Sequence, residues 1–153
     1  MQIFRGAMSL ILLFCLDASA HGEIIAQCFS SKGFSYFPSL GLNPKSAGEF
    51  QNDGISKGSI WLDRQSNGNF DLLFSDGSDR QVSSIAEGGK VFRIGQGDQT
   101  LTIAVIYPNL SEVYTFMNTR SGPEVMWTTN KHSTPVLKAA AYFALCGHLE
   151  LQN

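Results

Sequence analysis

Turn-forming dipeptides recur along this chain at a steady interval, and this rhythm restricts the possible folds more than any other feature. The clearest are Asn67-Gly68 and Asp76-Gly77, because both residues of such a pair tolerate the positive φ angles of a tight hairpin turn. A spacing of roughly ten to thirteen residues is typical of antiparallel meanders and sandwiches. The other turn signals are Gly88-Gly89, 95–98, Pro108-Asn109, Ser121-Gly122 and 132–135.

Between these turns, apolar residues alternate with polar ones. Val125 and Trp127 are expected on one face of a strand, with Met126 and Thr128 on the other. A period of two indicates strands with one face on a core. The same pattern predicts one apolar face made of Leu101, Ile103, Val105 and Tyr107. We predict strands at 24–36, 57–63, 69–75, 80–86, 90–95, 99–107, 111–119, 123–130 and 136–146.

Two stretches allow more than one interpretation. Residues 37–56 are rich in Gly, Pro, Ser and Asn and are predicted to form a long surface loop, a kind of segment that is often functional. Residues 136–146 contain three alanines in a row, which raises helix propensity. We favour a strand there, because a final strand beside the first would bring the ends of the chain together. The fold expected is all-β, an antiparallel up-and-down barrel or barrel-like sandwich of about eight to nine strands.

The first twenty residues have the order of a secretory signal. Arg5 precedes the apolar run 7–16, and Ala18-Ser19-Ala20 supplies small residues for a signal peptidase. The apolar run is shorter than the roughly 20 residues of a membrane-spanning helix, and the rest of the chain has no apolar run of that length. We predict a signal peptide at 1–20 and a single β domain at 21–153, located in the periplasm or secreted.

Cleavage after Ala20 changes the cysteine count. The full chain has three cysteines, and Cys15 would leave with the signal. Cys28 and Cys146 would remain near the two ends of the mature domain. An even count in an exported chain predicts a disulfide, which would close nearly the whole domain.

Charge and motifs exclude several classes of function. The formal net charge is −2 and no run of Lys or Arg appears, so no nucleic-acid partner is expected. Gly-x-Ser-x-Gly occurs once, at 54–58 (GISKG), but without the preceding strand and following helix that a nucleophile elbow requires, and bridged cysteines would leave no thiol nucleophile. We therefore interpret the protein as a non-enzymatic domain with no cofactor, which binds a protein or a small molecule.

Several segments resemble small exported proteins of proteobacteria that carry no assigned function. The resemblance implies a periplasmic location in a Gram-negative cell and brings no activity with it. The segments that carry it are 52–58 (NDGISKG), 70–74 (FDLLF), 113–116 (VYTF), 126–131 (MWTTNK) and 138–146.

Large aromatic residues on four of the predicted strands are the candidate ligand-binding residues. If several share an interior they could line an apolar pocket, although such residues more often fill the core of a small barrel. The candidates are Trp61, Tyr107, Tyr114, Phe116 and Trp127.

The alternative function is copper binding. After cleavage His21 would be the first residue and would offer its amine and a ring nitrogen to copper(II), which favours such nitrogen sites. This start resembles that of copper-dependent polysaccharide oxygenases and small periplasmic copper carriers. Those families need a second, internal histidine, and here only His132 and His148 are available.

Overall fold

The computed structural model describes residues 22–43, 48–77 and 80–151. Those residues form ten β-strands and no helix. The predicted signal peptide and His21 lie outside them. The strands are β1 (Glu23–Tyr36), β2 (Phe50–Asp53), β3 (Ser59–Arg64), β4 (Phe70–Ser75), β5 (Val82–Ser83), β6 (Lys90–Gly97), β7 (Thr100–Ile106), β8 (Leu110–Thr119), β9 (Gly122–Lys131) and β10 (Lys138–Leu149).

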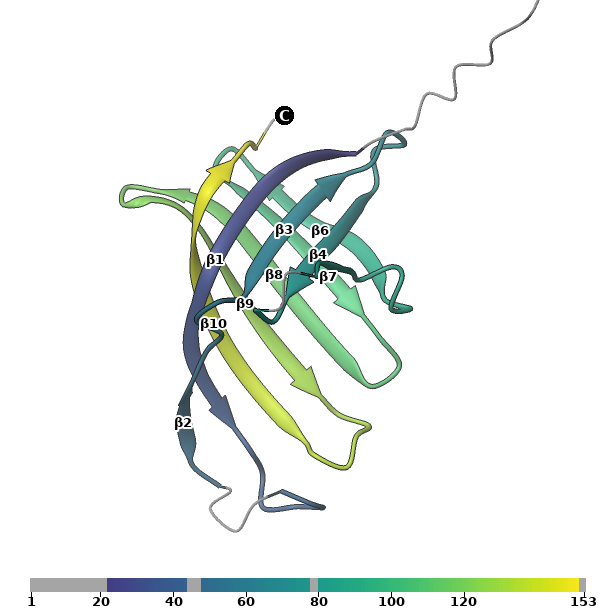
Figure 1. The fold of residues 1–153 in the computed structure, drawn as a ribbon, viewed down its shortest axis with the longest axis vertical. Helices are drawn as coiled ribbons and strands as arrows, with labels where there is room; N and C mark the ends of the chain where they lie inside the picture. Colours follow the sequence, from purple (N-terminus) through teal and green to yellow (C-terminus); the bar gives the residue numbers. More distant parts are fainter. Residues whose placement is uncertain (1–21, 44–47, 78–79, 152–153) are drawn as a thin grey trace, which may run out of the picture.

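All ten strands belong to one antiparallel sheet in the order β5-β4-β3-β1-β10-β9-β8-β7-β6, with β2 as an additional partner of β1. Strands β6 to β10 form an up-and-down meander, and β1 joins that meander to the smaller unit β3–β5. The sheet curls into a half-barrel, so that β1, β3 and β4 pass in front of β6 to β8 (Figure 1). The two ends of the sheet approach each other at β4 and β6. The predicted all-β, barrel-like fold is confirmed.

β1 is the longest strand and changes partner along its length. One edge pairs with β10 between residues 26 and 36, while the other pairs with β3 at residues 23–29 and with β2 at residues 33–36. Register shifts occur on β1 on both sides of Cys28 and Phe29, and Ser30 has a positive φ of 57°. Bulges of this kind bend a strand and increase its twist, which allows β1 to serve two partners on one edge.

Cys28 and Cys146 are paired in the register between β1 and β10 and form a disulfide with an S–S distance of 2.00 Å. The bridge joins residues 118 positions apart in the sequence. The prediction that the first and last strands are neighbours and are linked by these cysteines is confirmed.

The core lies inside the curl and is made by the predicted alternation. Along β9, Val125 and Trp127 are buried, while Met126 is 51% exposed on the opposite, convex face. Leu101, Ile103 and Val105 of β7 are buried in the same way. Several large apolar side chains remain exposed among the outward-facing residues, including Phe34, Phe92, Phe143 and Leu145.

Two of the expected elements are wrong. The predicted surface loop 37–56 contains β2, whose backbone pairs with β1 and whose Phe50 packs on Tyr36 with ring centroids 5.4 Å apart. The strand predicted at 80–86 is much shorter in the structure, where β5 comprises Val82–Ser83. There the carboxylate of Asp71 accepts hydrogen bonds from the Ser83 hydroxyl and the Ile85 backbone N–H, which fold the chain into a turn.

The segment 136–146 contributes to strand β10, as predicted. Its inward-facing residues are all buried, and they place the large ring of Tyr142 between two small side chains: the four residues are Ala140, Tyr142, Ala144 and Cys146. The alanines leave room for the aromatic rings beside them. Helix propensity is a weak preference, and here sheet packing overrides it.

Candidate functional site

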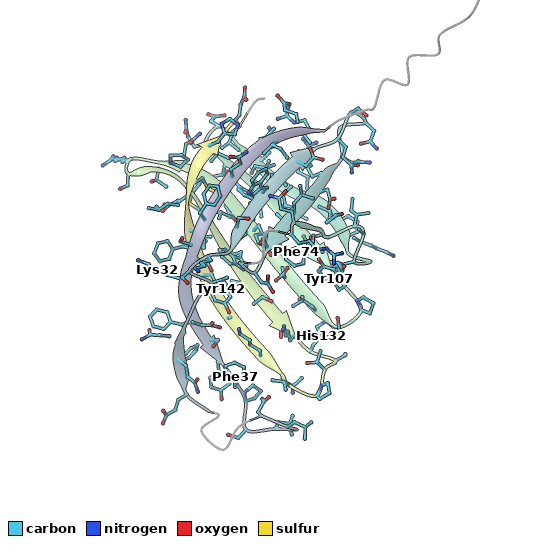
Figure 2. All side chains as sticks on the ribbon, in the orientation of Figure 1. Lys32, Phe37, Phe74, Tyr107, His132 and Tyr142 are labelled. Atoms are coloured by element: carbon cyan, nitrogen blue, oxygen red, sulfur yellow. A yellow bond between two sulfur atoms is a disulfide. The ribbon has the colours of Figure 1, made fainter. Side chains whose placement is uncertain are left out.

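The concave face of the sheet holds a cavity of about 480 Å³. It is lined from both halves of the sheet, because Phe74 of β4 and Tyr107, directly after β7, both contribute to it (Figure 2). Tyr114, Trp127 and Tyr142 form part of its wall, and Glu112 is among the charged residues that line it. A cavity of this size and lining is typical of small-molecule sites.

Three aromatic rings form a continuous row across the wall. Tyr114, Trp127 and Tyr142 are direct cross-strand neighbours on β8, β9 and β10. The ring centroids are 5.7 Å apart between Tyr114 and Trp127 and 5.0 Å apart between Trp127 and Tyr142, both in stacked geometry. Stacked aromatic pairs contribute about 0.5–1.5 kcal/mol beyond their buried area. The row therefore makes a stiff wall on the cavity.

On the far side of Tyr142 from Trp127, the next position across the sheet is a glycine, and this lets Tyr142 contact the strand beyond it. Gly33 of β1 pairs with Tyr142 on one side and with Asp53 of β2 on the other. A Cβ on Gly33 would lie 2.7 Å from Cδ1 of Tyr142 and 2.1 Å from the Ala141 carbonyl oxygen. Without a side chain at this position, the Tyr142 hydroxyl reaches across β1 and donates a hydrogen bond to Asp53 at 2.6 Å.

Asp53 also binds a lysine. Lys138 Nζ lies 2.5 Å from Asp53 Oδ2 and stands over the rings of Phe37 and Tyr142, at 5.6 and 5.5 Å from their centroids. Partial burial opposes the charged carboxylate, but the hydrogen bonds from Lys138 and Tyr142 outweigh it and lower the pKa of Asp53 to about 2. Burial and the neighbouring Asp53 raise the pKa of Tyr142. Lys138 lines the cavity, and its positive charge is thus balanced there by the carboxylate of Asp53.

Glu112 is an acidic group of the cavity wall itself. It is half-buried on β8, paired in register with Thr129 of β9. The Tyr114 hydroxyl donates a hydrogen bond to Glu112 Oε2 at 2.8 Å. Burial raises the pKa of Glu112, while hydrogen bonds from Tyr114 and Thr129 and the charge of Lys131 act in the opposite direction. Burial and Glu112 together raise the pKa of Tyr114 well above its usual value.

The structure brings together three of the five aromatic candidates. Tyr107, Tyr114 and Trp127 line the cavity. Phe116 is fully buried in the core. Trp61 alternates with the core residues Ile60 and Leu62 along β3 and is half-buried on the opposite face, so neither of these two candidates belongs to the cavity wall.

Sequence reasoning missed the polar residues of the cavity wall, among them Glu112, Thr129, Lys131, Lys138 and Tyr142, and it also missed Asp53, which binds Tyr142 from outside the wall. A signal for Glu112 was present, because the predicted alternation of strand 111–119 puts a carboxylate on the same face as Tyr114 and Phe116. For Asp53 the sequence offered no comparable signal, since its position depends on the pairing of β2 and on the gap at Gly33.

The two internal histidines lie far apart along β10. His132 is exposed in the turn before β10, with Nδ1 3.1 Å from the Ser133 hydroxyl. His148, near the other end of β10, pairs with Gln27 of β1. The fold therefore does not bring both to one metal ion. No three His, Cys, Asp or Glu side chains converge as metal ligands within residues 22–43, 48–77 and 80–151.

The chain matches no family model, no curated protein and no solved structure. In the part of the chain that the structure describes, no helix is both long and apolar enough to cross a membrane.

Proposed function

We propose that this protein is an exported, non-enzymatic binding domain that takes a small organic molecule into the cavity on its concave face. The observation that carries the proposal is the cavity itself: it combines a stiff aromatic wall, formed by Tyr114, Trp127 and Tyr142, with a small number of polar groups such as Glu112. Apolar walls with few, fixed polar groups are typical of ligand sites.

Polar groups of the wall are held in place by hydrogen bonds to each other or to Asp53 beside it, which suits binding more than reaction chemistry. Glu112 is held by Tyr114, and Asp53 by Tyr142 and Lys138. Such preorganised groups bind a ligand with little loss of conformational entropy.

Export is supported by the signal-like residues 1–20 and is compatible with the Cys28–Cys146 bridge, because disulfides persist in oxidising compartments. We place the protein in the periplasm of a Gram-negative cell or outside it. The mass of the mature protein tests this part. A chain beginning at His21 with both cysteines oxidised is expected, and a chain that keeps residues 1–20 would contradict it.

The binding proposal is tested with Nile red, an uncharged dye whose emission rises in apolar surroundings. The chain has two tryptophans, of which Trp127 lines the cavity and Trp61 does not. Trp61→Phe leaves a single reporter in the cavity, and Trp127→Phe leaves a single reporter outside it. We expect saturable dye binding that quenches Trp127 strongly and Trp61 weakly. Absence of saturable binding, or equal quenching of both reporters, would contradict a ligand site in this cavity.

A further inference from the structure

We propose that the ligand of the cavity is a small organic amine, with its ammonium group against the carboxylate of Glu112 and its apolar body against the aromatic wall. This inference rests on the binding function proposed above and names the class of ligand for the same site.

The first argument is the state of Glu112. An ionised carboxylate can accept about four hydrogen bonds, and Tyr114 and Thr129 supply donors for Glu112. Among the described residues, the ion pairs within 4 Å are Arg64–Glu23 and Lys138–Asp53, so Glu112 has no ion-pair partner there. Ionising a half-buried carboxylate that has no ion-pair partner costs free energy. An ammonium group of a ligand would both pair with its charge and use its remaining acceptor sites.

The second argument is the charge of the whole lining. The charged residues of the cavity are Asp76, Glu87, Glu112, Lys131 and Lys138. Lys138 is already paired with Asp53. Even with Asp76 left out of the count, Glu87 and Glu112 remain against the ammonium group of Lys131, which is exposed at the end of β9. This balance favours a cationic ligand over an anionic one, because the potential of a cleft follows the charges that line it.

The third argument is the type of apolar surface. Tyr107, Tyr114 and Trp127 surround the same space as Glu112. Aromatic side chains attract cations through their electron-rich faces, and Trp and Tyr do so most strongly. They also provide contact area for a hydrocarbon body. A ligand with a cation at one end and an apolar group at the other satisfies both parts of the wall.

The test uses three probes with one body and different head groups: 2-phenylethylamine, 2-phenylethanol and phenylacetate. Binding is measured by calorimetry and by Trp127 emission in the Trp61→Phe background. We expect the amine to bind at least about tenfold more tightly than the alcohol, since both can donate a hydrogen bond to the Glu112 carboxylate but only the ammonium also forms an ion pair with it. Phenylacetate should bind more weakly than the alcohol.

Glu112→Gln is the decisive variant, because Gln keeps an acceptor for Tyr114 but removes the charge. It should abolish the preference for the amine, because it weakens the binding of 2-phenylethylamine more than that of 2-phenylethanol. Glu124→Gln is the matched control. Glu124 precedes the inward-facing Val125 on β9 and so lies on the opposite face, and its variant should keep the preference.

Nile red separates the two proposals and also shows that each variant is folded. If the dye binds beside Trp127 and the amine shows no advantage over the alcohol, or if Glu112→Gln keeps the advantage, the amine inference is wrong and the binding function stands. If neither the dye nor any of the three probes binds, both proposals are wrong.

Discussion

Gly33 is the residue whose replacement tests the architecture of the site most directly. Gly33→Ala places a methyl group 2.1 Å from the Ala141 carbonyl oxygen and 2.8 Å from the Tyr142 Cα. Both atoms belong to the backbone of β10, so no side-chain rotation relieves the contact. The two strands must move apart where they are paired, or the ring of Tyr142 must leave its place beside Trp127 and Asp53.

The cost follows from these two effects. Forcing an extra methyl group into a packed site costs about 1–3 kcal/mol. Losing the hydrogen bond from Tyr142 to the charged Asp53 adds about 1.5–3 kcal/mol. We therefore expect Gly33→Ala to lower the free energy of unfolding by about 3–5 kcal/mol, measured by urea denaturation at neutral pH.

Gly147→Ala is the matched control for this substitution. Gly147 lies on β10, the strand that pairs with β1 at Gly33, and a Cβ there would be 3.8 Å from the Phe29 ring, an ordinary contact. Replacing such a glycine reduces the entropy of the unfolded chain, so the control should be neutral or slightly stabilising. If Gly33→Ala were as stable as Gly147→Ala, the close approach of β1 to Tyr142 would be refuted.

Three further predictions concern the elements around the site. Replacing Cys28 and Cys146 together by Ser should cost about 2–5 kcal/mol in urea unfolding, because the bridge closes nearly the whole domain; an unchanged midpoint would contradict this. Asp53 has a folded-state pKa of about 2 against an ordinary 3.8. Because solvent screens this partly exposed group, we expect its ionisation to contribute about 1 kcal/mol of stability, fully present above pH ~4 and lost as pH falls through the folded-state pKa. Asp53→Asn should therefore lose less stability than the parent between pH ~4 and ~2. Trp127→Ala should cost about 3–5 kcal/mol, since the indole is 6% exposed and is stacked between two tyrosines; a cost below about 1 kcal/mol would mean that the ring is not packed.

Most strands were predictable from the sequence, because hairpin turns and period-two alternation are local signals. The expected strands at 90–95 and 99–107 correspond to β6 and β7, with boundaries that differ by at most two residues. β2 was missed because its four residues, FQND, contain a single apolar side chain. Its formation depends on the free edge of β1 beyond the bulge at Ser30, which no local pattern reveals.

The site was predictable only in its apolar part. Tyr114 and Trp127 fall on the buried faces that the alternation defines, and register places them side by side. Separating the wall from the packed core was not possible from the pattern, because Phe116 follows the same alternation as Tyr114 and is buried without lining the cavity. The boundary between core and cavity depends on how far the sheet curls, which is a property of the whole chain.

Asp53 connects the fold of the protein to the charge of its cavity. It holds β2 to β10 through Tyr142, and it neutralises Lys138 at the cavity wall. Asp53→Asn keeps the size of the side chain but leaves the ammonium of Lys138 unpaired beside the ligand. The proposed preference for 2-phenylethylamine over phenylacetate should then fall by about threefold to tenfold, corresponding to a change of about one kcal/mol between partly exposed charges.

A double variant separates this electrostatic effect from damage to the fold. Asp53→Asn combined with Lys138→Gln removes both charges of the pair and so restores the balance of Glu112 and Glu87 against Lys131 that the parent has. The double variant should recover the amine preference of the parent even though β2 has lost its ionic link to β10. If Asp53→Asn alone left the preference unchanged in a folded chain, the ammonium of Lys138 would not act on the ligand. If the double variant failed to recover it, the loss would come from movement of β2, and charge neutralisation would not be the role of Asp53 in the site.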